Sequence, residues 1–414
     1  MVAQLSYFGH DAGVKAYRIG THRTVDPQAT LDRINPFMDE MGITRIANVT
    51  GLDHVGIPVV MVCRPNSRSI SVSQGKGVEL SAAKASGVME AVETYHAERI
   101  TLPLKLCSFE ELKRNHPVVD VLRLPFARES RYRNDVALLW IEGRNLINDQ
   151  PVWLPHELVH TDYSLPQPTG SGCFSANTNG LASGNHTLEA IAHGLYEVIE
   201  RDAITLWRLE SSMLGSHPLD LESVDDPTCR GLLEQFEHAE LEVRVWNVTS
   251  DAGVACFFCM LMDKEDADTE PEFGSGCHPT RQIALLRALT EAAQARTTYI
   301  AGSRDDFSPE IYSVSARARR TRACRELMAR QTPGQMFQQV PTFEADTISD
   351  DIAWTLGQLQ ALGIDEVVAV DLSQQRFQVP VARVIVPGLE GVYKGEHSDY
   401  APGARARAML ESGS

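Results

Sequence analysis

The chain has 414 residues, and its 38 basic and 55 acidic residues give a formal net charge of −17. This acidic balance argues against nucleic-acid or anionic-membrane binding as the main task. Residues 1–20 carry no secretion signal and no stretch reaches transmembrane length, so we expect a cytoplasmic protein that binds neither nucleic acid nor membrane.

In chain order, the hydrophobic pattern first predicts a helix over residues 30–41 and then strands over 43–49, 56–64 and 69–73. A glycine turn over 74–77 follows and leads into a second helix. Lys76 in this turn lacks the spacing of a P-loop lysine. Its charge and the nearby N–H groups suit a phosphate, but a plain tight turn explains the pattern equally well.

The remaining pattern continues the alternation, with helices over 315–330 and 349–362 and strands over 135–142, 151–154, 242–247, 254–263, 366–371 and 379–386. The segment 175–185 is dense in glycine and small polar residues, which lets the backbone approach a ligand closely. It opens another helix, for which Asn185 and Thr187 are the N-cap candidates. An acidic loop over 264–272 and the segment 273–278 introduce a third helix of the same kind.

The eight cysteines are scattered through the chain and are predicted to be reduced thiols. Cys256 and Cys259 have the C-x-x-C spacing of redox and zinc motifs, but they lie in the continuous apolar run 254–262. Because a second cysteine pair is missing, we interpret this run as a core strand.

Three predicted helices share one spacing of polar residues: Ser86-xxx-Glu90-xx-Glu93, His193-xxx-Glu197-xx-Glu200-Arg201 and Arg287-xxx-Glu291-xx-Gln294-x-Arg296. Residues three and four apart share a helix face, so each phrase aims its side chains at a common point. Such pairs are also common on solvated helix faces. The first two phrases are nearly apolar all round, however, which predicts buried carboxylates that need a cation. Magnesium is the divalent cation that suits hard oxygen ligands, so we predict a magnesium nucleotide site built from three helices.

Two further groups extend this predicted site. A groove wall is expected along the second helix, formed by Asn185, Glu189, Glu197, Glu200 and Arg201. Arginines of the third helix, Arg281, Arg287 and Arg296, bring the positive charge that nucleotide phosphates require, although ordinary salt bridges to the other helices are an alternative.

Together these residues resemble the YcaO family along almost the whole chain. The matching segments are the first phrase, residues 178–185 with Glu189 to Arg201, the helix 286–296 and the segment 380–389. The resemblance implies an α+β fold, with mixed sheets and packed helices around a central groove for ATP and magnesium. We expect residues 1–400 to form a single domain with its core at about 65–390, and residues 401–414 to be a mobile tail.

The resemblance also assigns roles to residues. Magnesium would be held by Glu90, Glu93, Glu197 and Glu200. By the same resemblance, the nucleotide would be contacted by Ser86, Asn185, Glu189 and Arg201. From the local charge and helical spacing we add Lys76, Arg287 and Gln294 as expected nucleotide contacts. Catalysis would depend on Glu200, Arg201 and Arg287.

Departures from the family pattern narrow the expected reaction. Thr94 stands where the family often has arginine, so one phosphate contact is expected from elsewhere. The chain does not end in the P-x-P-x-P tail common in azoline-forming members, and its segments 17–25 and 42–52 look more like the branch that works with a TfuA-type partner. That branch implies thioamide formation on a substrate peptide, with an external sulfur donor.

Two alternatives stay open. One is a cyclodehydratase that forms azolines from Cys, Ser or Thr of a ribosomal peptide, and the other is a non-catalytic ATP-binding accessory factor. No fused partner or leader-recognition segment is recognisable, so a separate partner protein is expected. The apolar content is compatible with a homodimer.

Overall fold

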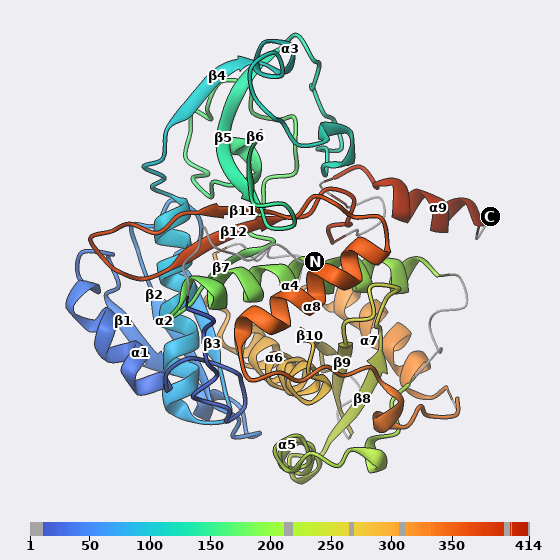
Figure 1. Ribbon diagram of the computed structural model, residues 1–414. Coiled ribbons are helices and arrows are strands. Elements are labelled where there is room, and N and C mark those ends of the chain that lie inside the picture. The colour runs from blue at the N-terminus through green and yellow to red at the C-terminus, as the bar shows by residue number, and fades with distance from the viewer. Residues whose placement is uncertain are drawn as a thin grey trace.

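Three antiparallel sheets and the helices packed on them form the described part of the molecule (Figure 1). The computed structural model describes residues 11–210, 218–264, 269–305, 312–330, 332–392, 398 and 400–412. The combination of helices and antiparallel sheets confirms the predicted α+β class. Within these residues, no helix has the length and apolar character needed to cross a membrane.

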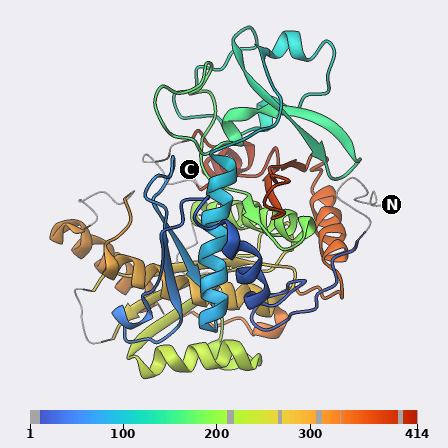
Figure 2. The same ribbon diagram turned by 90° about the vertical axis from the view of Figure 1, so that its left-hand side faces the viewer.

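The first sheet joins three consecutive strands in the order β1 (Arg45–Asn48), β2 (Val59–Cys63) and β3 (Val72–Lys76). Helix α2 (Leu80–Ala97) follows directly and packs on β3 and β2, with the short helix α1 (Pro27–Ile34) against its side. Figure 2 shows α2 crossing the front of this sheet. A Cβ added at Gly75 would lie 2.0 Å from the Ala83 oxygen, so only glycine lets the helix backbone lie this close to the strand.

The second sheet repeats this arrangement with β8 (Leu241–Asn247), β9 (Cys256–Asp263) and β10 (Glu272–Cys277), followed by α6 (Arg281–Ala301). Here Gly276 takes the place of Gly75, because a Cβ there would lie 2.1 Å from the Ala284 oxygen. The two units therefore have the same strand order and the same glycine-dependent contact between strand and helix. Cys256 and Cys259 are buried in β9, which confirms that their segment is a core strand.

The third sheet has the order β4 (Leu104–Ser108), β5 (Ala137–Asn145), β11 (Val368–Asp371), β12 (Val381–Ile385) and β7 (Leu181–Ser183), with β6 (Gln150–Pro155) also paired to β5. Helix α4 (Thr187–Leu209) lies against β12 and β7. In Figure 1, β4, β5, β6 and the short helix α3 (Phe109–Leu112) form the upper lobe, while β11 and β12 cross below it. The long helices α2 and α4 are thus brought together by β7.

The remaining helices surround this frame: α5 (Pro227–His238), α7 (Val314–Met328), α8 (Ile348–Ala361) and α9 (Ala404–Ser412). Helix α5 packs on the second unit, and α8 and α9 contact α4. Within the segment 401–414, for which a mobile tail was predicted, residues 404–412 form α9. Arg405 anchors this helix through ion pairs with Asp202 at 3.0 Å and Asp251 at 2.5 Å.

Several predicted boundaries also differ from the structure. The first helix begins at Pro27 and not at residue 30, because Asp26 caps it through the Ala29 N–H. Residues 74–76 belong to strand β3 and not to a glycine turn. The glycine there serves close packing, which sequence alone does not distinguish from a turn.

Two more corrections concern the later helices. His186, and neither Asn185 nor Thr187, caps α4 by accepting from the Leu188 N–H. The segment 273–278 lies mostly in strand β10, and residues 265–268 of the predicted acidic loop fall outside the described residues. Strands β4 and β7 had no prediction because they are short. Helix α5 was missed although Asp226 caps it and Pro227 begins it, which are signals of a helix start.

Candidate active site

A cavity of about 1140 Å³ lies between α2, α4 and α6. The cavity is lined by the residues expected to hold magnesium, contact the nucleotide or act in catalysis: Lys76, Ser86, Glu90, Glu93, Asn185, Glu189, Glu197, Glu200, Arg201, Arg287 and Gln294. Arg281 and Arg296, which were expected to bring positive charge for the phosphates, are not part of the lining. Arg296 instead pairs with Asp53 at 2.9 Å, and Arg281 donates to the backbone oxygens of Gln338 and Val340. The three helical phrases therefore do meet at one place. The contacts of each lining residue indicate what it can do in the cavity.

Helix α2 contributes two half-buried carboxylates. Glu93 accepts hydrogen bonds from both the backbone N–H and the hydroxyl of Ser183, at 2.9 and 2.8 Å. Burial raises the pKa of Glu93 to about 8; the Ser183 hydrogen bonds oppose this rise, and the nearby charges of Glu90 and Glu197 add to it. Burial likewise raises the pKa of Glu90 to about 7, against the opposing charges of Arg304 and Lys76. The positive charge near Glu90 and Glu93 therefore does not offset the effect of burial, and the pKa of both carboxyl groups stays raised.

Helix α4 adds two more carboxylates on the facing wall. Glu200 accepts a hydrogen bond from the Ser275 hydroxyl at 2.8 Å and pairs with Arg201 at 3.0 Å. Arg201 also lies 3.8 Å from Glu197. Burial raises the pKa of Glu197, Arg201 lowers it, and the charge of Glu200 raises it further. One arginine is therefore shared between two carboxylates.

These four carboxylates fit a divalent cation. Glu90, Glu93 and Glu197 each have a pKa raised by burial, and for each the charge of a neighbouring carboxylate adds to the rise. Like charges gathered in a low-dielectric cavity are costly unless a cation lies among them. Carboxylate oxygens are the ligands that Mg²⁺ prefers. The donor set is consistent with the magnesium ligands that the sequence suggested.

The third wall carries positive charge. Lys76, at the end of β3, pairs with Glu291 of α6 at 2.6 Å. Burial would raise the pKa of Glu291, but the charges of Lys76 and Arg201 outweigh it and lower that pKa. Arg287 lies 3.0 Å from the His193 Nε2. Burial, with the charges of Arg287 and Arg23, lowers the pKa of His193 far enough that the ring is neutral and accepts this hydrogen bond.

Three polar atoms on this wall are buried without a partner in the described chain: Arg287 Nε, Gln294 Oε1 and Gln74 Nε2. The Gln74 oxygen accepts from Gln294 Nε2 at 3.2 Å and from the Thr298 hydroxyl. Buried polar groups are normally hydrogen-bonded. The residues that carry these atoms line the cavity, which therefore borders polar groups whose hydrogen bonds are not all formed within the described chain.

The N-terminal segment closes the other end of the cavity. Glu189 accepts from both the N–H and the hydroxyl of Thr24 at 2.6 Å, and Arg23 lies 3.9 Å from it. Asn185 donates its N–H to Glu189 at 2.9 Å and accepts from the Thr30 hydroxyl at 3.1 Å. Residues from the start of the chain thus hold in place two residues that were predicted to contact the nucleotide.

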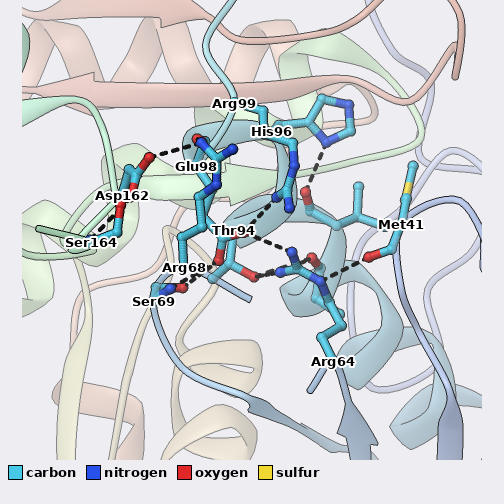
Figure 3. Close-up of polar contacts among 12 residues, drawn as sticks. Met41, Arg64, Arg68, Ser69, Thr94, His96, Glu98, Arg99, Asp162 and Ser164 are labelled. Atoms are coloured by element: carbon cyan, nitrogen blue, oxygen red, sulfur yellow. Dashed lines mark hydrogen bonds and ion pairs between the residues drawn. The ribbon is translucent and has the colours of Figure 1, made fainter. Parts of the chain in front are cut away.

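The C-terminal end of α2 is fixed by a buried arginine, as Figure 3 shows. Arg64 is 2% exposed and donates to the Thr94 hydroxyl at 2.7 Å, to the Met41 oxygen at 3.1 Å and to Glu98 at 2.8 Å. Thr94 lines the cavity, whereas Arg64 is not part of the lining. Its guanidinium is bound by Met41, Thr94 and Glu98. This contact keeps α2, and with it Glu93, in register.

Several cavity residues were not among the predicted site residues. Glu291 and His193 belong to the noticed phrases, so a stricter use of their spacing would have found them. Gln74, Ser275 and Ser183 carry no such signal, because they reach the site only through the pairing and packing of their strands. Arg23 lies in the segment 17–25, for which only a resemblance to the branch with a TfuA-type partner was noted.

A second cluster of ligand-type atoms lies apart from the cavity lining, in His22, His278 and Asp351. The Thr280 N–H donates to Nδ1 of His278 at 2.9 Å, which places the proton of that ring on Nε2. A metal-bound imidazole instead donates from its second nitrogen. Asp351 is also paired with Lys15 at 2.6 Å. These contacts describe a buried ion pair beside two neutral histidines better than a metal centre.

Comparisons with known proteins agree with this geometry. A family model described as YcaO cyclodehydratase, ATP- and Mg²⁺-binding, matches residues 74–390. A Rhizobium leguminosarum bv. trifolii protein named for its place in the tfuA 3′ region is 36% identical over 394 residues, covering 93% of this chain and 92% of the relative. A protein from Methanothermobacter thermautotrophicus is 37% identical over 382 residues, covering 89% and 95%.

Solved structures show the same fold. A structure described as a heterocyclase in complex with substrate and cofactor superposes with a TM-score of 0.77 at 23% identity, covering 93% of this chain and 54% of that one. A YcaO protein from Methanopyrus kandleri bound with AMPPCP and Mg²⁺ gives a TM-score of 0.72 at 22% identity, covering 94% and 99%. At these identities the likeness establishes the architecture alone.

Proposed function

The chain belongs to the YcaO family, which binds ATP and Mg²⁺, and we propose that it uses ATP to convert a backbone amide of a peptide into a thioamide. The sulfur would come from an external donor, and a TfuA-type protein would assist. The observation that carries this proposal is the cavity where four carboxylates face Lys76, Arg201 and Arg287. The relative named for the tfuA 3′ region supports the choice of partner.

Magnesium would be held by Glu90, Glu93, Glu197 and Glu200. When bound, it supplies positive charge that neutralises and aligns the phosphates. Glu93 is oriented by its two hydrogen bonds from Ser183, and Glu200 by Ser275 and Arg201. These contacts fix the carboxylate oxygens before any ligand arrives, which limits the entropy lost on binding.

The nucleotide would contact Ser86, Asn185, Glu189 and Gln294, with Lys76, Arg201 and Arg287 on its phosphates. Arg287 suits this role because its Nε is buried without a partner while Nη2 is held by His193. Charge-assisted hydrogen bonds from a fixed guanidinium stabilise charge that develops during phosphoryl transfer. We assign Glu200, Arg201 and Arg287 to catalysis on this basis.

The chemistry follows from the properties of an amide. Its carbonyl is a poor electrophile and its oxygen a poor leaving group, so exchanging oxygen for sulfur requires the oxygen to be activated. Hydrosulfide would add to the carbonyl carbon, and the resulting oxyanion would attack a phosphorus of ATP and displace the rest of the nucleotide. Loss of the thiol proton and departure of the phosphate ester oxygen then leave C=S. No side chain has to act as a covalent nucleophile.

We further propose that residues 1–400 act as one domain with its core at about 65–390, because the three phrases that build the cavity are spread over residues 86–296. The second candidate function is azoline formation, in which a Cys, Ser or Thr of the substrate attacks the carbonyl. The description of the family as cyclodehydratases favours keeping it.

The test is ATP turnover with magnesium, a candidate peptide, sulfide and a TfuA-type partner, compared between the wild type and Glu200→Ala. Glu234→Ala, at an exposed position on α5, is the matched control. Peptide-dependent turnover that Glu200→Ala abolishes, with a product heavier by the difference between sulfur and oxygen, is the expected result. A product lighter by one water would replace the proposal with azoline formation. ATP binding without turnover in every mixture would favour an accessory role.

A further inference from the structure

A second arginine is buried away from the carboxylates, on the central strand β12. Arg383 is 1% exposed and donates from Nη2 to the Asn177 carbonyl at 2.7 Å and, at 3.4 Å, to the Asn177 side-chain oxygen. Its Nε and Nη1 are buried and have no hydrogen-bond partner in the described chain. A guanidinium has five N–H donors, so most of the donor capacity here is unused.

The positive charge of Arg383 is also not neutralised. No carboxylate of the described residues lies within ion-pair distance of it, and the groups that act on it electrostatically are Tyr163 and Glu197. Burial lowers the pKa of Arg383 to about 10, which leaves it charged at neutral pH. Arg64 provides the contrast, because this equally buried guanidinium pairs with Glu98 at 2.8 Å (Figure 3). An unpaired buried charge is costly, so an anion is the missing partner.

A small cavity adjoins this guanidinium. It measures about 40 Å³ and is lined by Arg383 together with polar residues Ser175, Asn177, Asn179 and Tyr400 and several aliphatic side chains. The lining includes no acidic residue. A space of this size accepts a group on the scale of one or a few water molecules, and not a nucleotide or a peptide.

We propose that this cavity, the Arg383 chamber, binds a halide-sized monovalent anion, either chloride or hydrosulfide. One guanidinium balances one negative charge. The aliphatic part of the lining disfavours strongly hydrated dianions such as phosphate and sulfate, because they would lose more hydration than the chamber replaces. The two unpartnered nitrogens of Arg383 supply the donors for a single round anion.

The chamber is separated from the large cavity by a thin wall. Thr178 lines the large cavity, while its neighbours Asn177 and Asn179 line the chamber. The Asn177 carbonyl is held by Arg383, so an anion there would be sensed directly by the segment between the two spaces. If the anion is hydrosulfide, the chamber would hold the sulfur source next to the amide site; this part rests on the proposed function, whereas anion binding itself does not.

Bromide is the probe for a direct test, because it resembles both anions in size and has anomalous scattering. Crystals of the full chain soaked in sodium bromide should show an anomalous peak beside Arg383, and Arg383→Gln should remove it. The Arg64 guanidinium is the internal control. No anomalous peak is expected beside it, because it already pairs with Glu98. A chamber without bromide, or a peak that persists in Arg383→Gln, would overturn the proposal.

A solution measurement covers the case in which Arg383→Gln does not fold. The melting temperature of the wild-type chain should rise when chloride replaces gluconate at equal ionic strength, since an anion that binds only the folded state stabilises it. Equal melting temperatures in the two salts would contradict the site.

Adding hydrosulfide to the bromide soak distinguishes the two anions. Loss of the bromide peak assigns the chamber to hydrosulfide, and retention of the peak assigns it to chloride. Retention leaves the amide-activation proposal to its own test.

Discussion

Glu90 and Glu291 occupy equivalent positions in the two strand and helix units. Glu90 accepts from the Gln74 N–H at 3.4 Å and Glu291 from the Ser275 N–H at 3.3 Å, and in both pairs the partners are sixteen residues apart. Matching Gly75 with Gly276 brings the first and third helical phrases into register. Their recurrence in the sequence therefore reflects a repeated structural unit.

The two equivalent carboxylates are nevertheless in opposite electrostatic settings. Glu291 has Lys76 at 2.6 Å, and its pKa is lowered despite burial. Burial raises the pKa of Glu90 to about 7, and the nearby charges of Arg304 and Lys76 oppose this rise without reversing it. The α2 side thus keeps carboxylates free for a cation, while the α6 side is already neutralised by Lys76.

The raised pKa of Glu93 predicts a pH dependence for the metal-free protein. In the unfolded chain the pKa of this carboxyl is near its ordinary value of 4.5, whereas in the folded state it is about 8. Between these values the folded state binds more protons than the unfolded state, so stability falls as pH rises from about 4.5 to about 8. We expect Glu93→Gln to flatten this part of the melting-temperature profile. A variant profile parallel to that of the wild type would contradict the raised pKa.

Removing the charge at Lys76 should weaken ATP binding. The expected loss for Lys76→Met is roughly ten- to a hundredfold in affinity, as for a hydrogen bond between charged groups worth about 1.5–3 kcal/mol. Isothermal titration with a non-hydrolysable ATP analogue and magnesium measures this loss. Lys76→Arg, which keeps the charge, should recover most of it. Unchanged affinity in Lys76→Met would limit Lys76 to its ion pair with Glu291.

Gly75→Ala should destabilise the fold through α2. The added Cβ would lie 2.0 Å from the Ala83 oxygen, and a backbone atom cannot move aside cheaply. A loss of about 3 kcal/mol or more in the free energy of unfolding is expected from such overpacking. Gly51→Ala is the matched control, because nothing lies within 4 Å of its added Cβ. Urea unfolding of both variants gives the two losses in free energy of unfolding. Equal losses would show that the backbone around Gly75 relaxes to accommodate the added Cβ.

Arg64 is expected to matter for stability and, through the position of α2, for metal binding. Arg64→Met leaves the buried carboxylate of Glu98 with Arg99 at 2.6 Å and Ser69 as its remaining partners. Losing one member of a buried pair costs about 3 kcal/mol. The double variant Arg64→Met with Glu98→Gln should recover part of this loss in denaturant unfolding. Additive losses would show that the pair is not coupled.

The sequence by itself identified most of the candidate site. Glu90 with Glu93, and Glu197 with Glu200, are related by helical spacing, which is a local property of the chain and can be read without a structure. The apolar surroundings of these residues predicted burial, which the structure shows for Glu200, whereas Glu90, Glu93 and Glu197 are half-buried. The α+β class and most element positions followed from the same periodicities.

Only the tertiary structure decided how these faces are brought together. Strand pairing over long separations placed Ser183 on Glu93 and Ser275 on Glu200, and it brought Thr24 to Glu189. The role of Gly75 changed from a turn to a close helix contact for the same reason. The unpaired charge of Arg383 is likewise visible only when every neighbour is in place. Helix faces follow from spacing along the chain, whereas cavities and charge balance depend on contacts between residues far apart in it.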